Sequence, residues 1–293
     1  MVYPDLEQVL VPFVGRPYRE KRVQGVGGPG ITEIAGPLAT VVAKHNLTLA
    51  EQHFYQRYRS QVVRYGVDAP RLLASGYFPD DAWVVLEFVP PLLEKFRWSE
   101  RPDVLTILAH LHHIAGESRF IDPHDLYAFH WPDTLTADAL QYFPKTVVPS
   151  LRERITACQA MAHQVLFQPM ALIHGDPNPT NWGIRPSGQP VLFDWSRYGY
   201  GHPAIDLAIT IPGLPHLPET QRIAQAYLER TPDAQTASQL ARTIGLAKIW
   251  SAVEFLSMGH REKLSSAAGR GIAMLTADFP KWIAYWHRVL VTE

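Results

Sequence analysis

Residues 171–208 read ALIHGDPNPTNWGIRPSGQPVLFDWSRYGYGHPAIDLA and carry the most informative pattern in the sequence. Brief apolar runs predict three short strands in it, at residues 171–173, 182–184 and 191–193. Arg-Pro-Ser-Gly at residues 185–188 has the composition of a turn and separates the last two. Loops flanked by such strands are where proteins commonly display reactive groups.

Polar side chains stand at the ends of these predicted strands. Asp176 follows the first strand, Asn181 comes five residues later, and Asp194 ends the third strand. A carboxylate in such a place is costly to desolvate. Phosphoryl transfer requires a carboxylate that orients the attacking hydroxyl, and oxygen ligands that hold Mg²⁺ against the phosphates. Taken alone, Asp176 is equally well explained as a turn residue, because aspartate often precedes Pro and Asn in turns.

Three motifs occur together in this stretch: HGDxxxxN at residues 174–181, Phe-Asp-Trp at 193–195 and Gly-x-Pro-x-x-Asp-Leu-Ala at 201–208. The first has the spacing of the kinase catalytic loop, with glycine in place of arginine. In this order the motifs resemble those of the aminoglycoside phosphotransferase and choline kinase superfamily. The resemblance implies an α+β, protein-kinase-like fold of two lobes. We expect a small β-rich nucleotide-binding lobe at residues 1–90 and a larger, mostly helical lobe at 91–293.

The resemblance also implies roles for single residues. Asp176 would be the catalytic base or the group that orients the hydroxyl, and Asn181 with Asp194 would bind one or two Mg²⁺ ions. His174 would be structural. Asp206, from the Asp-Leu-Ala motif, would brace the catalytic loop without taking part in the chemistry.

Hydrophobic periodicity outside the motifs agrees with this division. Residues 21–90 contain β-branched and apolar runs at 40–42 and 83–89, with a helix predicted between them at 48–65. From about residue 100 the apolar residues recur at helical spacing, and a last helix is predicted over 272–290.

The nucleotide-binding half is expected to use a lysine paired with a helix carboxylate. Lys44 ends a predicted strand and Glu51 begins the next predicted helix, only seven residues later. That separation is short for the pair, and Lys44 as a solvated surface lysine is the alternative. Leu-Glu-Phe-Val at residues 86–89 resembles the strand and hinge that contact adenine, so Glu87 and Val89 are expected to meet the base through backbone groups.

A glycine-rich stretch, residues 25–30, would let the backbone approach phosphates closely, although Pro29 removes one amide donor. An ordinary hairpin turn explains the same glycines. The sequence contains no GxxxxGK[ST], which excludes a P-loop.

Composition narrows the possible partners. The 293 residues carry 27 basic and 28 acidic side chains, and a net charge of −1 favours neither nucleic acid nor an anionic membrane. Cys158 is the only cysteine, which excludes an internal disulfide and fits a reducing compartment, with a packed thiol as its simplest role. No signal peptide or membrane span is apparent, so we expect a cytoplasmic protein with a small-molecule partner.

Two other classes of function are alternatives. A metal-dependent hydrolase would need ligands such as His110, His112 and His113, but no HExxH or suitably spaced carboxylate joins them, so packed or solvated histidines are favoured. The other is a kinase-shaped binding or scaffold protein with weak or lost turnover. Retention of the motif residues argues against it.

The acceptor is not determined by the motifs. Proteins of the resembling superfamily phosphorylate aminoglycosides, choline, ethanolamine, homoserine, methylthioribose and other sugars or antibiotics. Acidic residues between Glu94 and Asp138 are candidates for attracting a cationic acceptor, and nearby aromatic side chains for cation–π contacts with it: Trp98, Tyr127, Phe129 and Trp131. An ordinary solvated loop explains these residues equally. Ser196 stands where the superfamily pattern has Glu after Asp-Trp, and the sequence does not decide between ATP and GTP or give the oligomeric state.

Overall fold

The computed structural model describes residues 4–23, 30–77, 81–90, 101–114, 121–231, 235–261 and 266–291. The chain divides into two compact units. The first comprises Met1–Lys95, Arg119–Tyr127 and Pro179–Tyr198, and the second comprises Phe96–Ser118, Ala128–Asn178 and Gly199–Glu293. Residues 179–198 therefore fold with the N-terminal part, whereas a division at residue 90 places them in the larger lobe.

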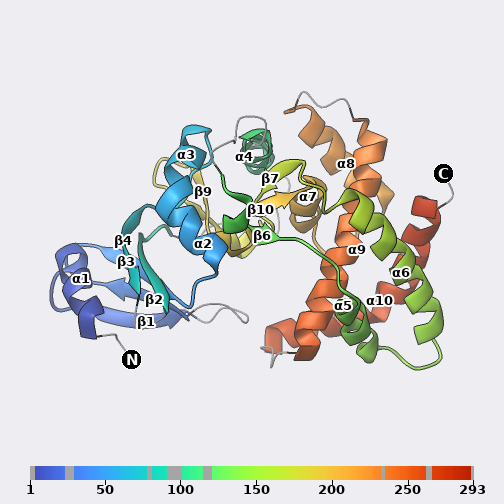
Figure 1. The fold of residues 1–293 in the computed structure, drawn as a ribbon, viewed down its shortest axis with the longest axis horizontal. Coiled ribbons are helices and arrows are strands. Elements are labelled where there is room, and N and C mark those ends of the chain that lie inside the picture. Colours follow the sequence, from blue (N-terminus) through green and yellow to red (C-terminus); the bar gives the residue numbers. More distant parts are fainter. Residues whose placement is uncertain are drawn as a thin grey trace. The chain divides into compact units, whose positions relative to one another are not determined.

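The first unit is built on a five-stranded antiparallel sheet (Figure 1). Its strands are β1 (Arg19–Val23), β2 (Gly30–Ala35), β3 (Thr40–His45), β4 (Leu72–Tyr77) and β5 (Ala82–Glu87). They lie in the order β1-β2-β3-β5-β4, with a register irregularity between β4 and β5 near Leu72. The β-rich character expected for the N-terminal part is confirmed, and the predicted strand at 83–89 ends earlier, at Glu87.

Helix α1 (Pro4–Val14) was not expected from the sequence. It carries Pro12 within the helix, which weakens the usual sequence signal. Leu10 and Val14 are fully buried and belong to one apolar cluster with Val41 and Val85 of the sheet. Burial of this apolar stripe gives the helix its stability.

The predicted helix at 48–65 forms in three pieces. Helix α2 (Leu49–His53) is followed by one π-helical turn (Phe54–Tyr58) and by α3 (Arg59–Arg64). Thr48 caps α2, since its hydroxyl accepts a hydrogen bond from the amide of Glu51 at 3.2 Å. π-helical turns occur often near functional sites.

Strands β8 (Trp182–Ile184) and β9 (Pro190–Leu192) form an antiparallel hairpin within the first unit. The turn expected at residues 185–188 is present, with the amide of Gly188 donating to the carbonyl of Arg185 at 2.8 Å. A 3₁₀ turn (Pro179–Asn181) precedes the hairpin, and another (Trp195–Arg197) follows it. Asn181 and Asp194 therefore flank the paired strands.

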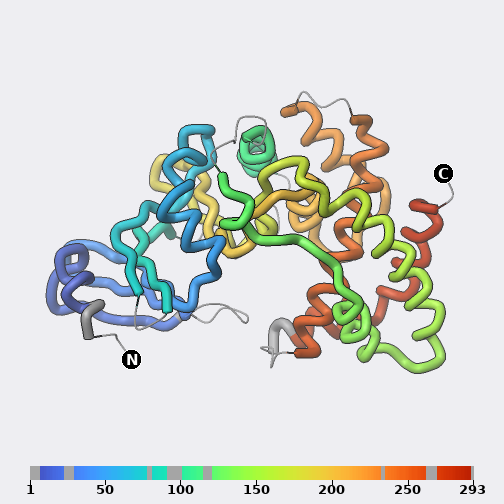
Figure 2. The backbone as a smooth tube through the Cα atoms, viewed as in Figure 1, coloured from blue at the N-terminus to red at the C-terminus, as the bar shows by residue number. Residues whose placement is uncertain are grey.

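The second unit is mostly helical. Its helices are α4 (Pro102–His113), α5 (Asp133–Ala139), α6 (Val148–Val165), α7 (Ala204–Thr210), α8 (Leu217–Leu228), α9 (Ala237–Arg261) and α10 (Ser266–Val291). The long helices α9 and α10 run against one another (Figure 2). Strand β7 (Ala171–Ile173) pairs antiparallel with β10 (Gly199–Gly201), and the chain passes from the first unit to the second within β6 (Tyr127–Ala128). The α+β fold class expected from the sequence is confirmed, with an antiparallel sheet in the first unit and a mostly helical second unit.

Two aromatic residues considered for a cationic acceptor belong to the core of the second unit. Trp131 is fully buried and its indole donates to Thr136 at 3.1 Å, while Phe129 makes an edge contact with Trp250. Neither ring is displayed by a solvated loop, and neither presents an open face to a ligand. Cys158 is also fully buried, and burial raises the pKa of its thiol to about 12, as expected for a packed residue.

Across the described ranges, none of the helices is both long and apolar enough to cross a lipid bilayer.

Candidate functional site

Lys44, on β3, is the centre of the polar site in the first unit. It is 5% exposed, and its ammonium group forms an ion pair with Glu51 of α2 and donates to Asp194 Oδ1 at 3.2 Å. Glu51 is fully buried, whereas the side chain of Asp194 is one-third exposed. The structure therefore brings together three of the residues selected from the sequence. Lys44 as a solvated surface residue is excluded.

Burial alone would lower the pKa of Lys44, because it disfavours the charged ammonium. Attraction by Glu51 and Asp194, with hydrogen bonds to both, outweighs burial and raises the pKa of Lys44 above its usual value. The lysine is therefore fully charged at neutral pH. A buried cation held between two carboxylates is suited to receive a further anionic group on its exposed side.

Lys44 and Glu51 can form an ion pair although only seven residues separate them, because the connection between β3 and α2 is very short. β3 ends at His45, Asn46 adopts a left-handed conformation with φ of 59°, and Thr48 already caps α2. Glu51 therefore lies in the first helical turn, where its amide bonds to Thr48 and its carboxylate is left to meet Lys44.

Asn181 and Asp194 lie at neighbouring ends of the β8–β9 hairpin. Trp182 is paired with Leu192, and the amide of Phe193 donates to the carbonyl of Asn181 at 2.7 Å. Asp194 has a positive φ of 56°, a left-handed conformation that is uncommon for residues other than glycine.

These two residues fit a magnesium site in their chemistry. A carboxylate and an amide oxygen are hard ligands, and Mg²⁺ in nucleotide sites is commonly held by one or two protein groups together with phosphate oxygens. Among the described residues no cluster of three or more His, Cys, Asp or Glu side chains forms a metal site made of protein groups alone. The pair is consistent with a metal that is bound together with a nucleotide.

The segment after Asp194 is fastened to α2 and the π-helical turn. The rings of Trp195 and Phe54 stack with centroids 3.9 Å apart and planes 7° from parallel. The hydroxyl of Thr48 donates to the carbonyl of Ser196 at 3.1 Å. Together with the Lys44 contacts, these interactions fix the backbone that carries Asp194.

In the second unit, Asp206 of α7 organises the loop that carries Asp176. One carboxylate oxygen accepts from the amide of His174 at 2.8 Å and the other from the amide of Gly175 at 2.7 Å. Gly175 has a φ of 83°, which only glycine adopts at little cost. The amide of Asp176 then donates to Nδ1 of His174 at 3.3 Å, so His174 and Asp206 both shape the backbone at Asp176.

Asp206 is itself held by His112 of α4. Nε2 of His112 lies 3.0 Å from Asp206 Oδ2, and its Nδ1 lies 2.9 Å from the hydroxyl of Tyr227. His110 and His113 are exposed on the same helix. The histidines considered for a hydrolase are thus divided between a buried brace and the surface, which removes the geometric basis for that alternative.

Glu87 and Val89, selected as hinge residues, lie at and just beyond the end of β5. The amide of Glu87 donates to the carbonyl of Arg71 at 2.9 Å, and Val89 is buried. The carboxylate of Glu87 is bound by Arg185 at 2.8 Å. The amide and the carboxylate of Glu87 therefore both have partners within the protein.

Two charged residues of the first unit were not selected from the sequence. Arg185 forms ion pairs with Asp68 and Glu87, and the buried Asp125 accepts hydrogen bonds from Tyr58 and, at 2.7 Å, from Arg57. Their partners lie 67 or more residues away in sequence, so local pattern gives no signal for them. Residues 25–29 of the glycine-rich stretch, together with Glu94 and Trp98, lie outside the described residues, and Gly30 begins β2.

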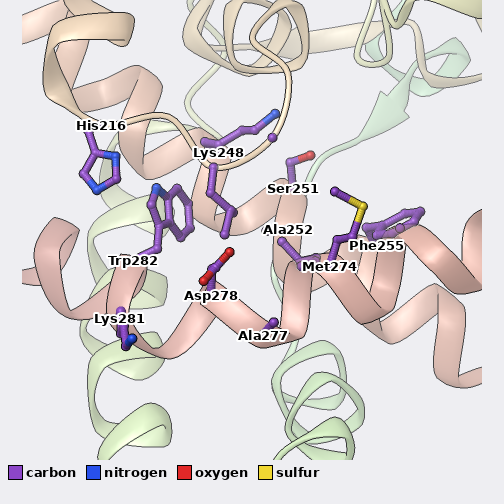
Figure 3. Close-up of a pocket in the computed structure, with 14 residues that line it drawn as sticks. His216, Lys248, Ser251, Ala252, Phe255, Met274, Ala277, Asp278, Lys281 and Trp282 are labelled. Atoms are coloured by element: carbon purple, nitrogen blue, oxygen red, sulfur yellow. The ribbon is translucent and has the colours of Figure 1, made fainter.

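The second unit also contains a cavity of about 970 Å³ between α9 and α10 (Figure 3). Phe255 and Met274 line one part of it, and Asp278 and Trp282 line another. Lys248, also in the lining, donates to the carbonyls of Ala208 at 3.1 Å and Ile211 at 2.6 Å, at the end of the helix that bears Asp206. The volume of the cavity is within the range of small-molecule sites.

Comparison with protein families gives the assignment that the motifs and the geometry support. The model of the phosphotransferase enzyme family matches residues 38–238, well over half of the chain. The chain belongs to this phosphotransferase family. The match covers all the site residues discussed above, from Lys44 to Asp206, and it confirms the resemblance seen in the motifs. A search of curated proteins found no significant match.

Solved structures similar to this phosphotransferase share its fold over nearly the whole chain. The choline kinase LicA from Streptococcus pneumoniae has a TM-score of 0.61 at 12% identity, covering 96% of this chain and 98% of that one. Spectinomycin phosphotransferase APH(9)-Ia, in complex with ADP and spectinomycin, has a TM-score of 0.60 at 11% identity, covering 96% of both. The amicoumacin kinase hAmiN, in complex with AMP-PNP, Ca²⁺ and Ami, has a TM-score of 0.60 at 14% identity, covering 94% of this chain and 92% of that one. At these identities the likeness is one of fold.

Proposed function

We propose that this phosphotransferase is a small-molecule kinase that transfers the γ-phosphate of ATP or GTP to a hydroxyl group of a small acceptor. The observation that carries the proposal is the contact of Lys44 with both Glu51 and Asp194. It joins a strand lysine, a helix carboxylate and a candidate metal ligand in the arrangement that kinases use at the phosphates.

The nucleotide would be held by the first unit. Lys44 would neutralise phosphate charge, and the backbone of Glu87 and Val89 would meet the base. Two of the similar structures contain AMP-PNP or ADP, which supports a nucleotide as the donor. The choice between ATP and GTP would rest on backbone groups of the hinge.

Asn181 and Asp194 would hold Mg²⁺. When bound, the ion would neutralise charge on the phosphate oxygens as it develops during transfer. The similar amicoumacin kinase structure contains Ca²⁺, another cation that prefers oxygen ligands, which supports a divalent metal at such a fold.

Asp176 would orient the acceptor hydroxyl and accept its proton. The bond from the acceptor oxygen to the γ-phosphorus forms as the bond to the leaving nucleoside diphosphate breaks. Asp206 and His174 would act on this step only through position, because they fix the backbone from residue 174 to 176. Most of the rate enhancement would come from this positioning and from electrostatic stabilisation by Lys44.

The acceptor would be a small hydroxylated molecule such as an aminoglycoside, an amino alcohol or a sugar. Similar structures are described as kinases of choline, ethanolamine and spectinomycin, all small hydroxylated molecules. Of the aromatic residues considered for cation–π contacts, Tyr127 has the guanidinium of Arg197 5.2 Å from its ring centroid. One face of that ring is therefore in use within the protein. The alternative of a catalytically inactive scaffold is less well supported, because the candidate catalytic residues are retained and Lys44 is paired.

The test is release of nucleoside diphosphate from Mg·ATP and Mg·GTP in the presence of aminoglycosides, amino alcohols, sugars and nucleosides. We expect one acceptor class to stimulate release, with phosphorylated acceptor detected in equal amount by mass spectrometry. Nucleotide binding without release against every acceptor would favour the scaffold. Absence of nucleotide binding would contradict the kinase proposal itself.

A further inference from the structure

Arg185 links three segments of the first unit that are distant in sequence. It lies in the turn of the β8–β9 hairpin, with its amide donating to Gln189 at 2.9 Å. Its guanidinium donates to Asp68 Oδ1 at 3.2 Å and to Glu87 Oε1 at 2.8 Å. A planar guanidinium presents its donors in a rigid fork, so it can bind two carboxylates at once in a defined geometry.

Asp68, the first partner, is well placed to transmit this constraint. It is 7% exposed, and its carbonyl accepts from the amide of Leu192 on β9 at 2.9 Å. The residues that follow are fixed as well, because the guanidinium of Arg59 donates to the carbonyls of Ala69 and Pro70. Arg185 and Leu192 therefore attach the hairpin to one rigid loop.

Glu87, the second partner, ends β5 where the hinge begins. Its carboxylate accepts from the amide of Arg71 at 2.8 Å in addition to Arg185. Burial alone would raise the pKa of Glu87, but the hydrogen bonds from Arg185 and from the amide of Arg71 outweigh burial and lower it. Glu87 is therefore charged at neutral pH, and the ion pair with Arg185 is present.

The hairpin also packs closely against the backbone of the hinge beyond Glu87. The amide of Ile184 on β8 donates to the carbonyl of Pro90 at 3.3 Å. Gly183 lies so close to this segment that an added Cβ would come within 2.8 Å of the same carbonyl and 2.2 Å of the Phe193 ring. The hairpin and residues 87–90 are thus packed as one block.

The two ends of this block have different proposed tasks in the nucleotide site. The hinge would contact the base, and the other end of the hairpin carries Asn181 and Asp194, which would bind the metal at the phosphates. A nucleotide engages both ends at once. Two contacts held at a fixed separation bind such a ligand more tightly than the same contacts on segments that move independently.

We propose that Arg185 is a positioning residue for nucleotide binding: by joining Glu87 and Asp68 to the β8–β9 hairpin, it holds the base-binding hinge and the metal-binding end of the hairpin at a fixed separation. This inference rests on the proposed kinase function. Arg185 itself touches neither the base nor the phosphates in this account.

The experiment compares Arg185→Gln with the full-length wild-type protein by isothermal titration of Mg·ADP, adenosine and inorganic tripolyphosphate with Mg²⁺. We expect the affinity for Mg·ADP to fall about 10–100-fold. Adenosine and tripolyphosphate each use one end of the block, so their affinities should change by less than about 3-fold. In turnover assays, KM for ATP should rise while KM for the acceptor is unchanged.

A double-mutant cycle with Glu87→Gln tests the route of the effect. If Arg185 acts through Glu87, the double variant should bind Mg·ADP no more weakly than Arg185→Gln alone. Arg71→Gln is the matched control, because the Arg71 side chain is two-thirds exposed and its Nε lies 4.0 Å from Oε2 of Glu87. It should bind Mg·ADP as the wild type does.

The inference is overturned if Arg185→Gln binds Mg·ADP normally, or if all three ligands weaken equally, which would indicate a general loss of folding. Either result leaves wild-type turnover, and so the kinase proposal, intact. Conversely, a wild type that binds nucleotide but phosphorylates no acceptor contradicts the kinase proposal alone. A wild type without nucleotide binding contradicts both.

Discussion

Lys44 is the residue in which the stability of the first unit and the proposed chemistry meet. Its side chain is 5% exposed, and its ammonium group pairs with Glu51, a carboxylate that would otherwise be buried without compensation. Burying a lone charge is far more costly than burying a pair, so removal of one partner leaves the other in a strongly unfavourable state. The site is therefore sensitive to single changes at Lys44 or Glu51.

Replacement Lys44→Met should lower the free energy of unfolding by about 3–5 kcal/mol at neutral pH, because Glu51 would remain buried without its cation. Urea unfolding of the full-length protein measures this change. The double replacement Lys44→Met/Glu51→Gln should lower the free energy of unfolding by less than Lys44→Met alone. A single variant as stable as the wild type would show that the pair contributes little.

The same pair gives a pH dependence with a definite sign. The folded-state pKa of Lys44 is raised above the unfolded value of about 10.5, so its contribution is fully present below that pH and is lost as pH rises through the folded-state pKa. The stability difference between wild type and Lys44→Met/Glu51→Gln should be constant from neutral pH to about pH 10 and shrink above pH 10.5. A difference that grows over this alkaline range would contradict the assignment.

The sequence identified Lys44, Glu51, His174, Asp176, Asn181, Asp194 and Asp206 as candidates because each belongs to a local motif. The structure contains the ion pair of Lys44 with Glu51, which the short separation left in doubt, and adds a contact of Lys44 with Asp194 that the sequence did not indicate. The left-handed conformation of Asn46 and the start of α2 directly after its cap, Thr48, bring Glu51 close enough to Lys44 for the ion pair. The roles of these residues in catalysis stay predictions.

At the scale of elements, α2 and the π-helical turn act as the support of the segment that bears Asp194. Phe54 is fully buried and stacks on Trp195. Such a contact between aromatic rings has a preferred geometry and excludes water over a large area. Loss of the ring would leave a cavity beneath the backbone that carries the metal ligand.

Phe54→Ala should therefore destabilise the protein by about 3–5 kcal/mol, measured by chemical unfolding. Weaker binding of Mg·ADP should accompany this loss at temperatures where the variant is still folded. Leu49→Ala, on the same helical segment but 56% exposed, is the control and should change stability by no more than about 0.5 kcal/mol. Equal effects of the two replacements would show that the stacked pair has no special weight.

Connections between elements are what the sequence could not provide. Arg185 meets Asp68 and Glu87 across 117 and 98 residues, and no periodicity records such a pairing. The sequence offers Phe129 and Trp131 either as candidates for cation–π contacts with an acceptor or as parts of a solvated loop, yet the fold buries both. Helix α1 is not predicted from the sequence because prolines disfavour a helix there. Its apolar face is stabilised only by packing against the sheet, which local sequence does not show.

At the scale of the whole molecule, nucleotide binding and folding should be linked. A ligand that binds only the folded state stabilises it, by about 2.7 kcal/mol at a free concentration 100 times its dissociation constant. Mg·ADP should raise the free energy of unfolding by this amount, whereas ADP with excess chelator should raise it less. In Asp194→Asn the dependence on Mg²⁺ should largely disappear. Stabilisation that is independent of Mg²⁺ in the wild type would contradict the proposed metal site.

The fold class was predictable at this scale because three motifs in order identify a superfamily whose architecture is constant. The division into lobes at residue 90 was based on a change in periodicity, and it placed residues 179–198 in the helical lobe. In the structure these residues belong to the first unit, since the hairpin is attached to Asp68 and Pro90 by backbone hydrogen bonds. A linear boundary cannot express such an interleaved arrangement.

Single-turnover transfer of label from γ-³²P-ATP with Asp176→Asn tests whether Asp176 serves phosphoryl transfer to an acceptor hydroxyl. We expect the variant to bind Mg·ATP with nearly wild-type affinity while the rate of acceptor labelling falls about 10²–10⁴-fold. Labelling of the acceptor at the wild-type rate by Asp176→Asn would exclude Asp176 from this role.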